Sequence, residues 1–347
     1  MSDLLVRAHA EGTPLIDGDS AVFVWEGETA PYLYSDATGW GKDDGISLTE
    51  TAPGLWTHSL EFLPDTYMEY AYINAEGRWR DPFNKRLISN GMGKKNHWFG
   101  MPAMRHTDLT LRKRGVARGL VTEHKITAGI LVADVQRSVY LYHPPTNEPV
   151  PLLVVLDGKD YATRAKLPII VDNLIAQKRI RPIALAMPQN GGEARFIEYM
   201  CSDATLAFLG RDVLPLATEH LHILPIEENP GAYGILGASM GGLMALYCGL
   251  RLPEVFGKVI SQSGAFGFDL MGNESVIYDL VRLYERRPIK IWMDVGRYEW
   301  LLTVNRKMHG VLNAQGYAPI YREYSGGHNY TAWRNDVVLA LEALFAP

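Results

Sequence analysis

The sequence predicts an α/β protein in two parts, an antiparallel β-sandwich over residues 1–110 and a mostly parallel sheet covered by helices over 111–347. Three observations support this division. Short strand-like segments fill residues 20–100, continuous runs of Val, Ile and Leu follow Gly119, and a glycine-flanked serine stands between one such run and a helical pattern.

Composition excludes several classes of protein. The 347 residues are 47% hydrophobic and 21% charged, which is typical of a soluble globular chain. A net charge of -5, from 34 basic and 39 acidic residues, gives no electrostatic footprint for nucleic acid. No apolar run approaches the roughly 20 residues that span a bilayer, and the first residues do not resemble a signal peptide. We therefore expect a cytoplasmic protein without a nucleic-acid or membrane partner.

The first part alternates strands and turns. Tyr70 and Tyr72 face one side of a predicted strand, and Ala71 and Ile73 face the other. No amphipathic helix of useful length is present, so an antiparallel sandwich is expected. Five of the eight tryptophans lie in this part, and we expect most of them to pack inside it, with stacking on a sugar or aromatic ligand as the alternative: Trp25, Trp40, Trp56, Trp79 and Trp98.

Residues 101–118 read as a connector, because they contain Pro102, Gly115 and the basic run 112–114. After it, GLVTEHKIT and QRSVYLYHPP predict a hairpin. Strands are then expected in PLLVVLDG, PIALAMP, YGILGA, KVISQSG, IKIWMDVG and PIYREYSGG, with helices near 162–178, 203–221, 275–284 and 299–315 and at the C-terminal end. Ligands bind beyond the carboxyl ends of strands in such sheets.

The segment GASMG around Ser239 fits the nucleophile elbow G-x-S-x-G of the α/β-hydrolases. In an elbow, strand and helix pass so close that the flanking positions must be small. A serine needs a base, and the α/β-hydrolase order is serine, acid, histidine. Only His309 and His328 lie downstream; His309 is inside a helical pattern, so His328, after the last strand and two glycines, is the expected base.

Two carboxylates compete for the role of acid. Glu299 lies five residues past Asp294, beyond Gly296, and a carboxylate that orients histidine must stand off the strand on a loop. This favours Glu299, with Asp294 as the alternative. The oxyanion hole is expected from two backbone N–H groups, that of Met240 at the start of the elbow helix and that of Lys159 after LLVVLDG.

These motifs resemble the enterochelin esterases, the siderophore trilactone hydrolases within the esterase-D-like α/β-hydrolases. The resemblance rests on VFVWEGETAPYLYSDATGW, the Asp81-Pro82-x-Asn84 segment, LLVVLDGKDY, GASMGG, VISQSGAF and GGHNYTAW in that order. It implies an early-set, immunoglobulin-like first domain and the same Ser239, His328, Glu299 and Lys159 roles. An anionic ferric catecholate would require cations, for which Arg164, Arg195 and Arg297 are candidates. One departure is Asn329, where the family more often has Asp after the histidine.

The sequence thus predicts a serine esterase that acts on a small-molecule ester through an acyl-enzyme, without a metal or organic cofactor. A close alternative is a carbohydrate acetyl or feruloyl esterase or a promiscuous short-chain carboxylesterase. A different class, a non-catalytic binding scaffold, would lack turnover of any ester. An oligomer is compatible with the sequence.

Overall fold

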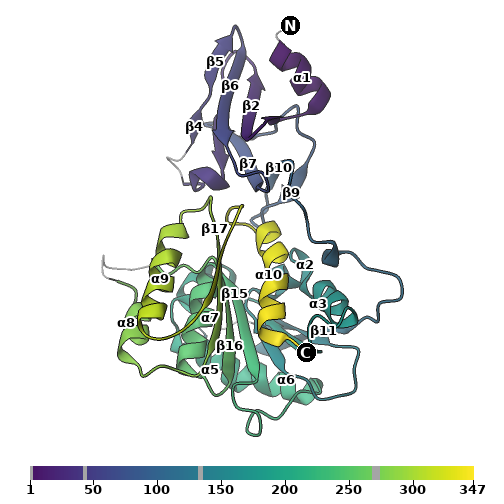
Figure 1. Ribbon diagram of the computed structural model, residues 1–347, viewed down its shortest axis with the longest axis vertical. Helices are drawn as coiled ribbons and strands as arrows, with labels where there is room; N and C mark the ends of the chain where they lie inside the picture. Colours follow the sequence, from purple (N-terminus) through teal and green to yellow (C-terminus); the bar gives the residue numbers. More distant parts are fainter. Residues whose placement is uncertain (1–2, 42–44, 132–135, 268–273) are drawn as a thin grey trace. The chain divides into compact units, whose positions relative to one another are not determined.

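The computed structural model describes residues 3–41, 45–131, 136–267 and 274–347, which form two compact units (Figure 1). The first unit contains the chain up to His106 and two short later segments, Gly296–Trp300 and Tyr324–Ala332. The second unit contains Thr107–Val295, Leu301–Glu323 and Trp333–Pro347. The first unit is therefore discontinuous in the sequence.

Two antiparallel sheets make up most of the first unit. Their strand orders are β1-β2-β6-β5 and β4-β3-β7-β10-β9, with β8 paired to β7. The elements are α1 (Asp3–Glu11), β1 (Leu15–Asp17), β2 (Ser20–Glu26), β3 (Tyr32–Ser35), η1 (Asp36–Thr38), β4 (Ile46–Ser47), β5 (Thr49–Ala52), β6 (Leu55–Glu61), β7 (Tyr67–Asn74), β8 (Gly77–Trp79), β9 (Leu87–Ser89) and β10 (Lys95–Gly100). The expected antiparallel sheets are present, and the finer early-set assignment stays a prediction.

Aromatic side chains from both sheets form the core of this unit. Phe23 of β2 packs edge to face against Tyr70 of β7 and Phe99 of β10, with ring centroids 5.1 and 5.7 Å apart. Trp25 is buried against Tyr72, whereas Trp79 is exposed. Alternate residues of each strand thus point toward the other sheet, and together they form the core between the two sheets.

An eight-stranded sheet dominates the second unit, in the order β11-β12-β14-β13-β15-β16-β17-β18. The leading hairpin is antiparallel, β12 joins β14 antiparallel, and the pairs from β14 through β13, β15 and β16 to β17 are parallel. The strands are β11 (Leu120–Thr127), β12 (Gln136–His143), β13 (Leu152–Val155), β14 (Ala184–Pro188), β15 (Tyr233–Ala238), β16 (Phe256–Gln262), β17 (Lys290–Gly296) and β18 (Ile320–Tyr324). This is the mostly parallel sheet that the apolar runs predict.

Helices cover the sheet on both faces. Every residue of β13, β14 and β15 is buried, as expected of parallel strands between two helical layers. α7 packs on β15 and β16, and α8 and α9 follow it on that flank, while Figure 1 shows α2, α3 and α10 on the other. The elements are η2 (Asp108–Thr110), α2 (Gly158–Thr163), α3 (Leu167–Ala176), η3 (Gly192–Ala194), α4 (Arg195–Tyr199), α5 (Asp203–Phe208), η4 (Leu209–Val213), α6 (Leu214–His220), α7 (Met240–Arg251), α8 (Val276–Leu283), α9 (Leu302–Ala314) and α10 (Tyr330–Phe345).

Two of the expected helices are interrupted. The helix expected over 162–178 divides into α2 and α3, because Lys166 is left-handed, with φ 55°, and Pro168 starts the second segment. The helix expected over 203–221 contains a π-turn, η4, just before Pro215 in α6. Among the helices of the described residues, none is both long and apolar enough to cross a membrane.

Candidate active site

Ser239 occupies a strained turn between β15 and α7. Its backbone has φ 58° and ψ −122°, a conformation that non-glycine residues rarely adopt. The Ser239 N–H donates to Gln262 O at 2.9 Å, and its carbonyl accepts from Ala265 N–H at 3.0 Å. These bonds to the last residue of β16 and to the loop after it maintain the strained conformation, in which the side chain stands at the start of α7.

Close backbone contact explains the glycines around Ser239. A Cβ atom on Gly237 would lie 2.2 Å from Gly241 O, and one on Gly242 would lie 2.8 Å from Ser261 Oγ. Strand β15, helix α7 and strand β16 therefore approach too closely for side chains at these positions. The same argument explains Gly158, where a Cβ would lie 2.0 Å from Met187 O.

The two expected oxyanion donors differ in their surroundings. The N–H of Met240 is at the N-terminus of α7, where the helix dipole favours negative charge. The N–H of Lys159, in the first turn of α2, donates to Gln189 Oε1 at 2.9 Å. The side-chain oxygen of Gln189 thus occupies the position that a substrate oxygen would take at the Lys159 N–H. Sequence reasoning missed Gln189, which follows β14 directly.

Asp157 and Arg195 connect the loop after β13 to the elbow strand. Asp157 is left-handed, with φ 57°, and its carboxylate accepts from Arg195 Nε and Nη2 at 2.7 and 2.6 Å. Arg195 Nη2 also donates to Ala238 O at 3.3 Å, one residue before Ser239. This bidentate pair ties the turn that carries Lys159 to the strand that carries the serine.

The three arginines proposed for substrate have different surroundings. Arg195 is engaged by Asp157, and Arg164 pairs with Asp160 at 3.2 Å. Arg297 is exposed, and its backbone N–H donates to Tyr324 O at 2.9 Å. Arg195 and Arg164 therefore each face a carboxylate.

In the first unit, Glu299 and His328 form a hydrogen-bonded pair. Glu299 Oε2 lies 3.0 Å from His328 Nδ1, and the Glu299 side chain is fully buried. Because a carboxylate only accepts, Nδ1 carries a proton, and in the neutral imidazole Nε2 is then the nitrogen that can accept one. The ring of Trp300 lies 4.5 Å from the imidazole, and 51% of Trp300 is exposed. The pair has the geometry of a base with its orienting acid.

Asp294, the alternative acid, lies inside the second unit. It is fully buried on β17, and its Oδ2 accepts from Trp292 Nε1 at 2.7 Å and Gln262 Nε2 at 3.0 Å. Gln262 in turn donates to Trp333 O and accepts from the Tyr161 hydroxyl. These bonds indicate that Asp294 stabilises the sheet by linking β17 to β16.

Sequence reasoning also missed Asp36, a buried carboxylate at the start of η1. It accepts hydrogen bonds from Trp40 Nε1 at 2.9 Å, Glu69 N–H at 3.0 Å and Asn329 Nδ2 at 2.9 Å. Burial raises the pKa of Asp36 to about 6, although its three donors and nearby His328 oppose that rise. The sequence feature that could have pointed to Asp36 was its partner Asn329, where the family more often has Asp.

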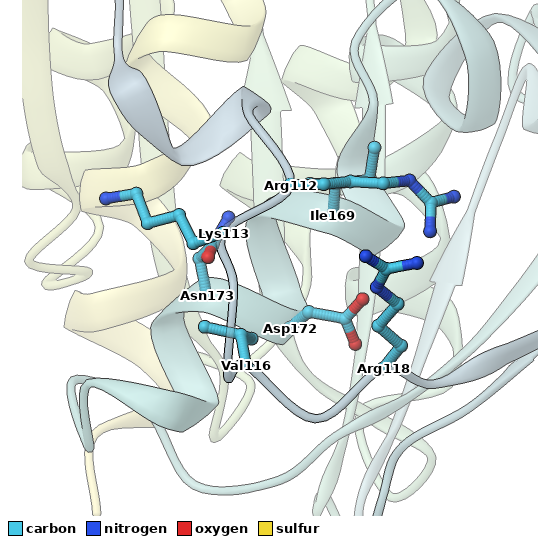
Figure 2. Close-up of a pocket in the computed structure, with 7 residues that line it drawn as sticks. All are labelled: Arg112, Lys113, Val116, Arg118, Ile169, Asp172 and Asn173. Atoms are coloured by element: carbon cyan, nitrogen blue, oxygen red, sulfur yellow. The ribbon is translucent and has the colours of Figure 1, made fainter.

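The pocket in Figure 2 lies elsewhere in the second unit, between the connector and α3. Asp172 accepts there from Gly119 N–H and the Tyr142 hydroxyl, and Asn173 Nδ2 donates to two carbonyls of the connector. None of its lining residues is a site candidate: Arg112, Lys113, Val116, Arg118, Ile169, Asp172 and Asn173. The pocket marks where the connector is fastened to the helix.

The buried Asp36 predicts a specific pH dependence of stability. Because its pKa is raised in the folded state, the folded chain binds the extra proton, and stability falls as the pH rises from about 4 to about 6. The difference in unfolding free energy between wild type and Asp36→Asn should decrease by about 3 kcal/mol across this window and then level off. Urea titrations of both proteins from pH 4 to 8 measure it, and a difference that grows with pH would contradict the assignment.

The sequence and the fold are both similar to those of known esterases. A family model described as "Putative esterase" matches residues 132–344. Iron(III) enterobactin esterase of Dickeya dadantii is 32% identical over 226 residues, which are 59% of this chain and 51% of that protein. The chain thus matches about half the length of this curated relative.

Two solved structures share the fold. Ferric enterobactin esterase from Salmonella typhimurium has a TM-score of 0.77 at 19% identity and covers 95% of each chain. A ferulic acid esterase from Anaeromyces mucronatus has a TM-score of 0.55 at 18% identity and covers 67% of this chain and 93% of its own. The α/β-hydrolase fold and the resemblance to enterochelin esterases are therefore confirmed. The chain belongs to the esterase family whose model matches residues 132–344.

Proposed function

We propose that the chain hydrolyses carboxylic esters with Ser239 as nucleophile, His328 as base and Glu299 as the orienting acid. The observation that carries the proposal is the 3.0 Å hydrogen bond between Glu299 Oε2 and His328 Nδ1, which places a buried carboxylate at one ring nitrogen and makes Nε2 the nitrogen that accepts a proton. The strained backbone of Ser239 at the start of α7 is the second support.

The strand order supports a common site for these residues. β15, β16, β17 and β18 are successive neighbours in one sheet. Ser239 follows β15, Glu299 follows β17 and His328 follows β18. Catalytic groups of α/β sheets gather beyond the strand ends, and serine, acid, histidine is the α/β-hydrolase order.

In the first half of the reaction, Ser239 Oγ attacks the ester carbonyl while His328 Nε2 takes the hydroxyl proton. Buried Glu299 stabilises the imidazolium that forms without taking the proton itself. The N–H groups of Met240 and Lys159 stabilise the oxyanion, and the substrate oxygen replaces Gln189 Oε1 at Lys159. His328 then returns the proton to the leaving alkoxide, and an acyl-enzyme remains.

In the second half, water attacks the acyl-enzyme. His328 Nε2 removes a proton from the water, the same two N–H groups stabilise the second oxyanion, and the proton passes to Ser239 Oγ as the acid leaves. Every proton transfer uses Nε2 of His328, so the orientation of the imidazole ring matters in both halves of the reaction.

The substrate we propose is an anionic siderophore ester of the iron(III) catecholate trilactone class. The Dickeya dadantii relative is named for iron(III) enterobactin, and the structural match to the Salmonella typhimurium esterase extends over both units. Arg164, Arg195 and Arg297 are the cations we assign to its charge, and exposed Arg297, two residues before Glu299, is the most accessible of them.

An aromatic ester of a carbohydrate is the second candidate substrate. The Anaeromyces mucronatus structure supports it, although that match extends over only 67% of this chain. The exposed ring of Trp300 beside His328 offers a flat apolar surface on which a feruloyl group could stack.

Replacing the nucleophile tests the reaction. Ser239→Ala should fold normally, because it removes one hydroxyl, and should lose at least about 10⁴-fold in kcat. A panel of a catecholate trilactone, a feruloyl sugar ester and p-nitrophenyl butyrate, with fluorophosphonate labelling, measures it. Retained turnover in Ser239→Ala would reject the mechanism, and absence of turnover and labelling in wild type would favour a binding scaffold.

A comparison of two isosteric variants assigns the acid. Glu299→Gln should lower kcat by about 10³- to 10⁴-fold, because an amide cannot stabilise the imidazolium. Asp294→Asn should lower kcat less than about tenfold but reduce the melting temperature, since it disturbs bonds to Trp292 and Gln262. The reverse ranking of the two kcat values would make Asp294 the acid.

If the Asp157–Arg195 pair positions the elbow, replacing Arg195 should lower kcat even when the positive charge is kept. Arg195→Lys keeps the charge but cannot bond Asp157 with two nitrogens and Ala238 O together, so kcat should fall about tenfold. Arg306→Lys, in an exposed bidentate pair with Glu323, is the matched control and should retain kcat. Equal kcat values for the two variants on p-nitrophenyl butyrate would show that Arg195 does not position the elbow.

A further inference from the structure

The loop that carries His328 has little stiffness of its own, because Gly326 and Gly327 precede the histidine. Two bonds from the N-terminal part of the chain hold it on either side. Tyr67 N–H, at the start of β7, donates to Ser325 O at 3.1 Å. Asn329 Nδ2 donates to Asp36 Oδ2 at 2.9 Å. His328 thus lies between two points that are fixed by residues from the first hundred of the chain.

Asp36 itself is firmly placed. It is 2% exposed, Trp40 Nε1 donates to one carboxylate oxygen, and Glu69 N–H donates to the other. Glu69 belongs to β7, so the carboxylate is bonded to the same strand that contacts Ser325. A Cβ atom on Gly327 would lie 2.1 Å from Asp36 Cβ, which shows how closely the loop lies against this residue.

The loop with the acid is attached to the same sheets. Tyr298 N–H donates to Gly326 O at 3.1 Å, which joins the two loops. The Tyr298 hydroxyl accepts from Leu63 N–H at 2.9 Å, and its ring packs against Phe62 at 5.2 Å. Both members of the Glu299–His328 pair therefore depend on contacts with the N-terminal sheets.

We propose that Asp36 is a positioning residue for His328, acting through Asn329, so that the N-terminal sheets are part of the hydrolytic machinery. The inference rests on the proposed role of His328 as the base. It requires that the carboxylate of Asp36 and the amide of Asn329 act as a pair that sets the direction of the imidazole.

The amide at 329 is suited to both of its neighbours. Its Nδ2 donates to Asp36, and its Oδ1 accepts from Ala332 N–H in the first turn of α10 at 2.9 Å. An aspartate at 329 could accept from Ala332 in the same way, but it would place a second carboxylate against Asp36. An amide at 329 therefore suits buried Asp36 better than a carboxylate would.

Three variants of the full chain test the pair. Asp36→Ala removes the acceptor of Asn329 Nδ2, and Asn329→Asp places a second carboxylate against Asp36. Asn329→Ser retains an oxygen that can cap α10 but does not reach Asp36. Asp19→Asn, at an exposed position of the same unit, is the matched control. The measurements are kcat and KM for p-nitrophenyl butyrate and the rate at which a fluorophosphonate labels Ser239.

Each single variant should lower kcat and the labelling rate by about 10- to 100-fold with KM within about twofold, because the base is misdirected while substrate contacts remain. Asp19→Asn should match wild type. Wild-type kcat in folded Asp36→Ala, or in Asn329→Ser if Asp36→Ala does not fold, would overturn the proposal. Turnover in Ser239→Ala would instead reject the proposed function, so the two failures are distinguishable.

Discussion

A histidine on a glycine-rich loop has no fixed direction unless groups outside the loop provide one. In this chain the direction of His328 comes from three sources: Glu299 at Nδ1, the β7 strand at Ser325, and buried Asp36 at Asn329. Because one imidazole nitrogen would carry every proton in the proposed reaction, these contacts matter more than any single helix or strand of the scaffold. They also give the buried carboxylate of Asp36 a role in the proposed reaction.

In the second unit, a strained backbone fixes the position of Ser239, the proposed nucleophile. Ser239 and Asp157 both adopt positive φ angles at strand ends, where the sheet and its helices leave no room for side chains on Gly237 and Gly158. Strain of this kind persists only where surrounding bonds determine the conformation. The bidentate contact from Arg195 to Asp157 is one of these bonds. The same ion pair therefore helps to fix both the turn at Ser239 and the loop that carries Lys159.

Much of this organisation could be predicted from local patterns. Apolar runs and alternation identify the two kinds of sheet, and the spacing past Gly296 favours Glu299, the carboxylate that contacts His328. Two kinds of feature were beyond that reasoning. The break at Lys166 depends on a backbone angle, and the bond between Asp36 and Asn329 joins residues 293 positions apart. Periodicity carries no information about a contact of that separation, and only the unusual Asn329 hinted at it.

The discontinuity of the first unit has a consequence for biosynthesis. Chains are made from the N-terminus, and units ordinarily fold as they emerge from the ribosome. Here the N-terminal sheets cannot complete their contacts until Tyr324–Ala332 has been translated, long after the strands themselves are available. Until Asn329 has been made, Asp36 lacks one of its three donors, so the last contact of the buried carboxylate forms late in synthesis.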